Sequence, residues 1–180
     1  MSRPPLAREK VLDAFESLLC DGGARAATMD ATARAAGVSK GGLLYHFASK
    51  DALESALVER MVAIARADLE AMRAEPAGVV ASFIRGSIMT GTPLDRAIVA
   101  VAKLAQGGSS IASDSLHRVR DLWEETLRPH VRDETALQLV MLVSDGLYFN
   151  NALAIGTVPG PDLTREALDA LIALVEASVR

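Results

Sequence analysis

The sequence predicts an all-α fold: a three-helix N-terminal domain followed by a C-terminal helical bundle, with about nine helices in total. Three observations support this prediction. Half of the 180 residues are hydrophobic but only 4% are aromatic, which favours helices packed by aliphatic side chains. Apolar residues recur at helical spacing between breaks rich in Gly, Pro and Ser. No stretch shows the alternation expected of a half-buried strand.

The first helix is predicted from about residue 6 to residue 20. Val11, Phe15 and Leu18 share one face of it, and residues 21–23 (Asp-Gly-Gly) are expected to end it. Cys20, the only cysteine, is interpreted as a buried structural thiol, with a redox sensor as the alternative. The flanking arginines are predicted to be solvated surface charges, with phosphate contacts from the flanks as the alternative: Arg3, Arg8 and Arg25.

Residues 28–50 predict two short helices joined by a tight turn, with a long helix directly behind them. Thr28 and Ser39 are suitable N-caps for the two short helices. Gly37 lies where a helix commonly ends in a left-handed residue. This pattern predicts a helix-turn-helix, the unit whose second helix enters the major groove of DNA. The alternative is a plain helical hairpin with its aromatic residues in the core.

The composition of the second short helix also favours a nucleic-acid contact. Leu43 and Phe47 are spaced to pack against the preceding helix. Two adjacent glycines cost about 1 kcal/mol each inside a helix, so keeping them suggests a close approach of the backbone to another molecule. Phosphate oxygens could be met by Tyr45, His46 and Lys50.

At these residues the run AAGVSKGGLLYHFASKDAL, residues 35–53, resembles the DNA-binding signature of tetracycline-repressor-type (TetR-type) transcriptional regulators. The resemblance covers about residues 7–61. It implies phosphate contacts at two helix N-termini, a groove-facing surface on the second short helix, and a flanking contact from His46. The predicted DNA-binding residues are Thr28, Ser39, Lys40, Gly41, Gly42, Leu44, Tyr45, His46 and Lys50.

Two positions depart from the family's pattern. Thr32 stands where an aliphatic residue is usual. Leu44 stands where many members carry tyrosine, so the resemblance implies one polar groove contact fewer in this chain.

The rest of the chain predicts six helices. Ser49 is expected to cap a long helix over residues 50–73, which links the DNA-binding part to the remainder. Five more are expected at about 78–90, 94–106, 110–128, 132–156 and 162–179. The predicted domains are residues 1–50, the helix-turn-helix DNA-binding domain, and residues 51–180, the effector-binding and dimerisation domain.

The segment 137–155 is apolar on nearly all faces, so a helix there must be covered on most sides. The TetR resemblance implies that the last two helices pair with their copies in a homodimer; the alternative is a fully intramolecular core. A two-fold dimer would present two recognition helices to a pseudo-palindromic site.

Three polar residues of that apolar segment need hydrogen-bond partners: Asp145, Asn150 and Asn151. They either bond to each other, to backbone or to the sister subunit, or some of them line a pocket for a small molecule. A pocket in this region is what the TetR resemblance implies, and apolar lining would suit a hydrophobic or aromatic effector. The predicted effector-binding residues are Met89, Leu104, Trp123, Met141, Asp145, Tyr148 and Asn151.

Enzyme classes find no support in the sequence. It contains no Gly-x-Ser-x-Gly elbow, phosphate-binding loop or His-Glu-x-x-His motif. Asp114 and His117 are interpreted as a surface contact and His130 as exposed. We therefore expect no catalytic residues, no metal and no cofactor.

Charge and hydropathy complete the expectation. Residues 1–50 carry a net charge of +2 and the remainder −6, which fits a nucleic-acid-binding end and an acidic remainder. No signal segment or membrane span is recognised, so a cytoplasmic location and no membrane partner are expected. The sequence thus predicts a homodimeric regulator that binds a double-stranded DNA operator and acts as a repressor released by a small effector. The alternative is a helix-turn-helix protein that acts through protein partners without an effector.

Overall fold

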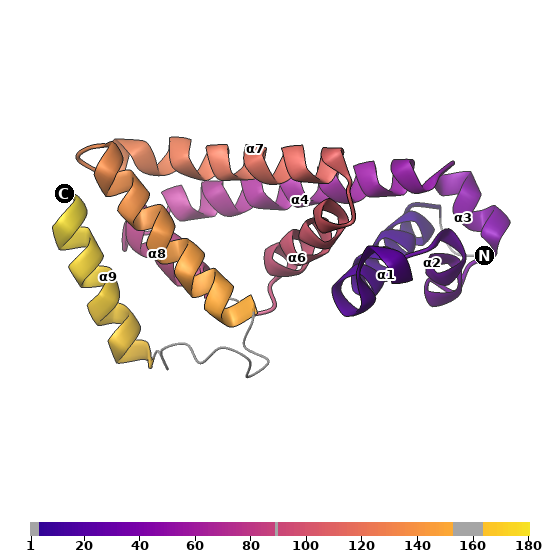
Figure 1. Cartoon of the computed structure of the whole chain (residues 1–180), viewed down its shortest axis with the longest axis horizontal. Coiled ribbons are helices and arrows are strands. Elements are labelled where there is room, and N and C mark those ends of the chain that lie inside the picture. Colours follow the sequence, from indigo (N-terminus) through magenta and orange to yellow (C-terminus); the bar gives the residue numbers. More distant parts are fainter. Residues whose placement is uncertain (1–3, 89, 153–163) are drawn as a thin grey trace. The chain divides into compact units, whose positions relative to one another are not determined.

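The computed structural model describes residues 4–88, 90–152 and 164–180 of the chain, and all regular secondary structure within this part is helical, as predicted. Figure 1 shows the helices coloured along the chain, from indigo at the N-terminus to yellow at the C-terminus. Their bounds are α1 Pro4–Ala26, α2 Met29–Ala35, α3 Lys40–His46, α4 Lys50–Arg73, α5 Val79–Gly86, α6 Pro93–Gln106, α7 Ser110–Leu127, the short 3-10 helix η1 Arg128–His130, α8 Glu134–Ala152 and α9 Arg165–Val179.

The helices form two compact units. The first comprises Met1–Ala65 and Gly91–Val119, and the second comprises Arg66–Thr90 and Arg120–Arg180. Helices α4 and α7 therefore contribute residues to both. This division differs from the predicted boundary at residue 50, because α6 packs on α1 in the first unit. The assignment of separate functions to residues 1–50 and 51–180 stays a prediction.

Helix α1 runs further than the sequence predicted. Its buried face is formed by Val11, Phe15 and Leu19, whereas Leu18 is only half-buried. The expected stop at residues 21–23 is a local break instead: Gly23 has φ 70° and ψ −173°, and a last turn follows it up to Ala26. A side chain at Gly22 would lie 2.6 Å from the Cβ of Ala26, so the glycine allows this turn to fold back closely.

The helix-turn-helix is confirmed. Thr28 and Ser39 cap α2 and α3 as expected, and Gly37 has φ 67°, the left-handed conformation that glycine adopts without steric cost. Leu43 and Phe47 are buried, at 0% and 3% exposure. Helices α1, α2 and α3 contact one another (Figure 1).

The second unit has its own apolar core, to which the ends of α4 and α7 contribute together with α5, α8 and α9. Helix α8 buries Leu137, Val140 and Met141. Helix α9 contacts both α5 and α8 and buries one face through Ile172, Val175 and Val179. The predicted helix over residues 132–156 is described from Glu134 to Ala152, and its expected last turn lies outside the described residues.

Candidate nucleic-acid interface

Local side-chain to backbone bonds fix where α2 and α3 begin. The Thr28 hydroxyl accepts the Ala31 backbone N–H at 3.1 Å, and the Ser39 hydroxyl accepts the Gly42 backbone N–H at 3.0 Å. Each bond satisfies an N–H that has no partner inside its helix. The polar Thr32, which stands where an aliphatic residue is usual, also forms a local bond. Its side chain is fully buried, and its hydroxyl donates to the Thr28 carbonyl at 2.9 Å.

Helix α3 has one buried face and one strongly exposed face. Leu43 is fully buried, while the neighbouring Leu44 and Tyr45 are 43% and 81% exposed. His46 lies edge-on to the Tyr45 ring, with 5.1 Å between ring centroids. An added Cβ at Gly41 would meet no atom within 4 Å, so the surrounding protein does not require glycine there. Large apolar and aromatic side chains exposed on one helix face are typical of a surface that binds another molecule.

Both lysines of the predicted DNA-binding set already have a carboxylate partner. The Lys40 ammonium lies 3.0 Å from the Asp30 carboxylate. The Lys50 ammonium lies 3.7 Å from Glu54 and donates to the Ala24 carbonyl at 3.4 Å. Lys50 therefore ties the start of α4 to the end of α1.

Arg8 takes a role that the sequence reading missed. Its guanidinium, expected to be a solvated surface charge, stacks over the Phe47 ring at 5.1 Å from the centroid and pairs with Glu9 at 3.2 Å. The stacking joins α1 to the residue that ends α3. No local pattern marks this contact, because the two residues are 39 positions apart in the chain.

A buried carboxylate holds α1 against α4 and α6 in the first unit. Glu16 is 7% exposed; it accepts from Arg60 of α4 at 2.7 Å and from Arg96 of α6 at 3.0 Å. Arg60 also donates to Asp13 at 2.6 Å. The ion pairs satisfy the buried charge. They also hold α1 in place, and α1 is the helix that α2 and α3 contact.

The predicted effector-binding residues are distributed over both units. Leu104 is buried in the first unit, and Met141 is buried in the core of the second. Trp123 is half-buried with its ring 5.9 Å from that of Phe83. Two more belong to the second unit: Asp145, which is exposed and pairs with Arg120 at 3.0 Å, and Tyr148, which is half-buried. Met89 and the side chains of Asn150 and Asn151 lie outside the described residues.

The second unit also buries a polar contact that the sequence reading missed. The Ser87 and Ser144 hydroxyls lie 2.7 Å apart, and Ser87 donates to the Phe83 carbonyl at 2.8 Å. Ser144 stands one helical turn before Tyr148 on α8. A polar position inside an apolar segment was the available signal, but small hydroxyl residues also occur in ordinary helices.

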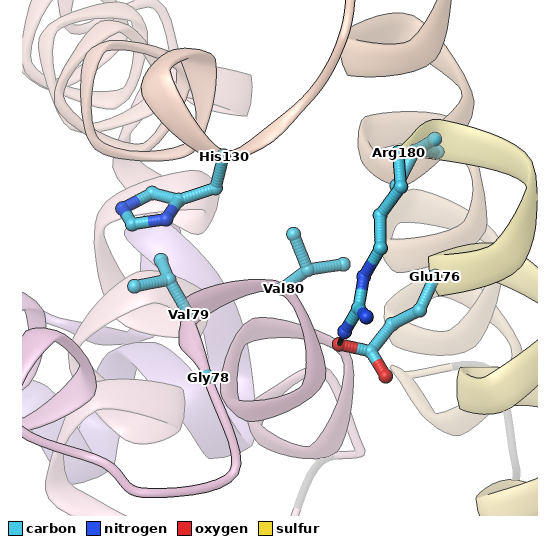
Figure 2. A pocket seen from close by; sticks show the side chains of 7 residues that line it. Gly78, Val79, Val80, His130, Glu176 and Arg180 are labelled. Carbon is cyan, nitrogen blue, oxygen red and sulfur yellow. Dashed lines mark hydrogen bonds and ion pairs between the residues drawn. The ribbon is translucent and has the colours of Figure 1, made fainter.

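One cavity in the second unit has a volume of about 140 Å³. In Figure 2 it lies between the start of α5, with Val79 and Val80, His130 of η1, and the end of α9. Glu176 and Arg180 face it as an ion pair with 3.2 Å between charged atoms. None of the predicted effector-binding residues lines it. It is also smaller than the roughly 300–1,000 Å³ usual for pockets of drug-sized ligands.

The described residues include no group of three or more His, Cys, Asp or Glu side chains positioned to hold a metal ion. Among the described helices none is long and apolar enough to cross a membrane.

Comparison with known proteins finds a family match for the N-terminal part of the chain. Residues 11–57 match the family described as "Bacterial regulatory proteins, tetR family", and these residues contain α2, α3 and the start of α4. Residues 11–57 are of the TetR type. The family resemblance predicted from the sequence is therefore confirmed.

Solved structures extend the TetR-type fold to nearly the whole chain. A TetR-family transcriptional regulator described as putative, from Rhodococcus sp., is 18% identical with a TM-score of 0.68, over 96% of this chain and 98% of that one. The ketosteroid transcriptional regulator KstR2 of Mycobacterium tuberculosis is 19% identical with a TM-score of 0.63, over 96% and 94%. A regulator described as putative, from Saccharomonospora viridis in complex with choline, is 17% identical with a TM-score of 0.66, over 95% and 94%. No curated protein shows a significant sequence match.

Proposed function

We propose that this chain is a DNA-binding transcriptional regulator whose helix α3 enters the major groove. The observation that carries the proposal is the two-sided character of α3 within a TetR-type helix-turn-helix. Tyr45 is 81% exposed while Leu43, two residues away, is fully buried. An aromatic side chain projecting from a recognition helix loses little conformational entropy on binding and offers both apolar and hydrogen-bonding contact.

The proposed contacts divide into positioning and base-reading groups. Phosphates are contacted near the capped helix starts by Thr28, Ser39 and Lys50, with His46 at the flank. Tyr45 and Leu44 meet base edges, and Leu44 supplies apolar contact such as a thymine methyl accepts. Gly41 and Gly42 let the backbone of α3 approach the duplex closely, and Lys40 adds a phosphate or base contact.

We further propose a homodimer formed by α8 and α9. Leu139 and Leu142, one turn apart on α8, are 39% and 65% exposed, and Leu174 on α9 is 65% exposed. The α9 residues Ala170, Ala173 and Ala177 are exposed as well. Large exposed leucines on two contacting helices favour burial against a second copy, and small residues beside them allow the helices to approach.

The proposed regulation is release from the operator when a small molecule binds, so that the protein acts as a repressor in the cytoplasm. The Saccharomonospora viridis protein was solved in complex with choline, which supports ligand binding by this type of fold. The proposed lining within the second unit is formed by Trp123, Met141, Asp145 and Tyr148. The 140 Å³ cavity is not assigned to the effector because of its size.

The proposed mechanism is a population shift between two arrangements of the dimer, one of which spaces the recognition helices to match both half-sites. Helix α4 begins directly after the helix-turn-helix and contributes Arg66–Arg73 to the second unit, so a tilt of α4 could link the two parts. Identical distances between the two Tyr45 side chains, with and without a releasing compound, would contradict this mechanism.

Fluorescence anisotropy tests the DNA proposal directly. The protein is titrated against DNA from just upstream of its own gene and against an unrelated duplex, at several salt concentrations. We expect preferential binding to the first duplex with a steep salt dependence. Tyr45→Ala should abolish the preference, whereas Ile111→Ala, which removes a 49% exposed side chain from α7, should leave it unchanged.

Equal and weak binding to both duplexes would move the search to fragments selected from the whole genome. Failure of that selection would favour the alternative function, action through protein partners.

A further inference from the structure

Asp30 is the only acidic residue in the segment 28–50, which otherwise carries the cations Arg34, Lys40 and Lys50. It stands in the first turn of α2, two residues after the cap Thr28. A carboxylate at this position opposes the binding of phosphates, since both are negatively charged. Its presence on the proposed DNA-binding surface therefore needs an explanation.

The contribution of Asp30 to the stability of the fold is too small to explain its presence. Asp30 lies 3.0 Å from the Lys40 ammonium, and the two side chains are 58% and 63% exposed. An ion pair as exposed as this contributes at most about 1 kcal/mol. The favourable interaction with the N-terminus of α2 is of similar size, roughly 0.3–1 kcal/mol.

The partner of Asp30 is more informative, because Lys40 is the first residue of the recognition helix. The other lysine of this surface is held differently. Lys50 donates to the Ala24 carbonyl and faces Glu54, whose side chain is only 14% exposed. Lys50 therefore also holds the start of α4 to the end of α1, whereas the Lys40 pair joins two exposed side chains and can be exchanged.

We propose that Asp30 is a specificity-determining residue that holds Lys40 away from DNA of the wrong sequence. In the free protein the Lys40 ammonium is neutralised by Asp30. On a mixed-sequence duplex, contact with a single phosphate does not offset the free energy lost when this ion pair breaks. Lys40 therefore contributes little to the binding of such DNA. On the preferred site the other contacts of α3 bring Lys40 to a phosphate, and the pair is exchanged. This inference rests on the proposed DNA-binding function.

The test measures binding of the full chain to a short mixed-sequence duplex by fluorescence anisotropy over a range of salt. Asp30→Asn keeps the size of the side chain and removes its charge. We expect its affinity to rise about two- to fivefold at 0.1 M salt, as an exposed pair worth at most about 1 kcal/mol allows, and the slope of log K against log salt to steepen by about 0.9, as for one more neutralised phosphate. The matched control is Asp121→Asn, an exposed aspartate on α7, which should change neither quantity.

A double variant separates the action through Lys40 from simple charge repulsion. In a Lys40→Ala background, Asp30→Asn should have no more than a small effect, because the lysine that it would release is gone. An Asp30→Asn effect of equal size in both backgrounds would overturn the inference.

The remaining outcomes separate the inference from the function on which it rests. Measurable binding by the natural sequence with no change on Asp30→Asn would overturn the inference alone. No binding by any variant to any duplex, even at low salt, would overturn the DNA-binding function together with it.

Discussion

At the scale of single residues, Gly41 separates the needs of folding from those of binding. A Cβ at Gly41 would meet no atom within 4 Å, and alanine is the better helix former. Gly41→Ala should therefore raise the free energy of unfolding, by at most about 1 kcal/mol. If the backbone of α3 approaches DNA here, the same change should weaken preferred binding by about tenfold, or roughly 1.4 kcal/mol.

Gly86→Ala is the matched control for this substitution. Gly86 also lies in a helix with open space around it, but in the second unit. It should leave DNA binding unchanged in the anisotropy assay, while urea denaturation reports stability. Full DNA affinity in Gly41→Ala would show that glycine is not needed for close approach.

Cys20 gives a prediction of chemical reactivity. The thiol is half-buried, with its sulfur 3.5 Å from the Arg96 carbonyl. Burial raises the pKa of Cys20, although Arg96 acts in the opposite direction. Because the thiolate is the reactive form, iodoacetamide should modify Cys20 several-fold more slowly than a free thiol at pH 7, and the rate should climb with pH. The same chain in urea is the control; equal rates with and without urea would contradict the assignment.

The sequence could predict the residues whose structural roles depend only on near neighbours in the chain. Thr28, Ser39 and Gly37 were recognisable because caps and left-handed turn positions depend on neighbours within a few positions. The partners of Arg8 and Glu16 were not recognisable, because Phe47 and Arg96 come from distant helices. The pairing of Asp30 with Lys40 was not recognisable either, because it depends on how α2 and α3 pack.

At the scale of helices, Glu16 tests what holds α1 in place. Its carboxylate accepts charge-assisted bonds from Arg60 and Arg96. A glutamine would present an N–H to one of these arginines, so Glu16→Gln should lower the free energy of unfolding by about 1.5–3 kcal/mol. Glu125→Gln, at an exposed position of α7, is the control. Equal urea midpoints for the two variants would exclude a structural role for the Glu16 pairs.

Helix boundaries show where element prediction succeeded. The start of α6 was predicted at about residue 94 and lies at Pro93, where Thr92 and Asp95 form a capping box and proline fits the first helical position. The end of α1 was not predicted correctly, since two glycines normally stop a helix, whereas here Gly22 permits a close approach of Ala26 after the break. Such a turn depends on packing that local propensity does not contain.

At the scale of the whole molecule, each compact unit is built from segments that are not consecutive in the chain. Residues 91–119 belong to the first unit although residues 66–90 precede them in the second. A boundary at residue 50 follows from the motif, but compactness depends on contacts such as that of Gly107, where a Cβ would lie 2.7 Å from the Cβ of Ala24. Sequence alone could identify the family and the recognition helix, but not this sharing of helices.

The proposed dimer links the second unit to DNA recognition and gives the last prediction. Leu142→Asp combined with Leu174→Asp places charges on the exposed leucines of α8 and α9, which are solvent-accessible in the single chain, so the fold should persist. Sedimentation velocity should show single chains in place of dimers. Ile111→Asp, a charge on another exposed apolar residue, should remain dimeric.

DNA binding should change with the loss of the dimer. Two linked recognition helices bind adjacent half-sites about 34–36 Å apart, and linkage makes the second contact intramolecular. The single chain should therefore bind the preferred duplex at least about a hundredfold more weakly than the dimer does. Its weak binding to unrelated DNA should be largely retained. A dissociated variant that kept the full sequence preference would show that each chain reads its site alone, and the pseudo-palindromic operator would then have no physical basis.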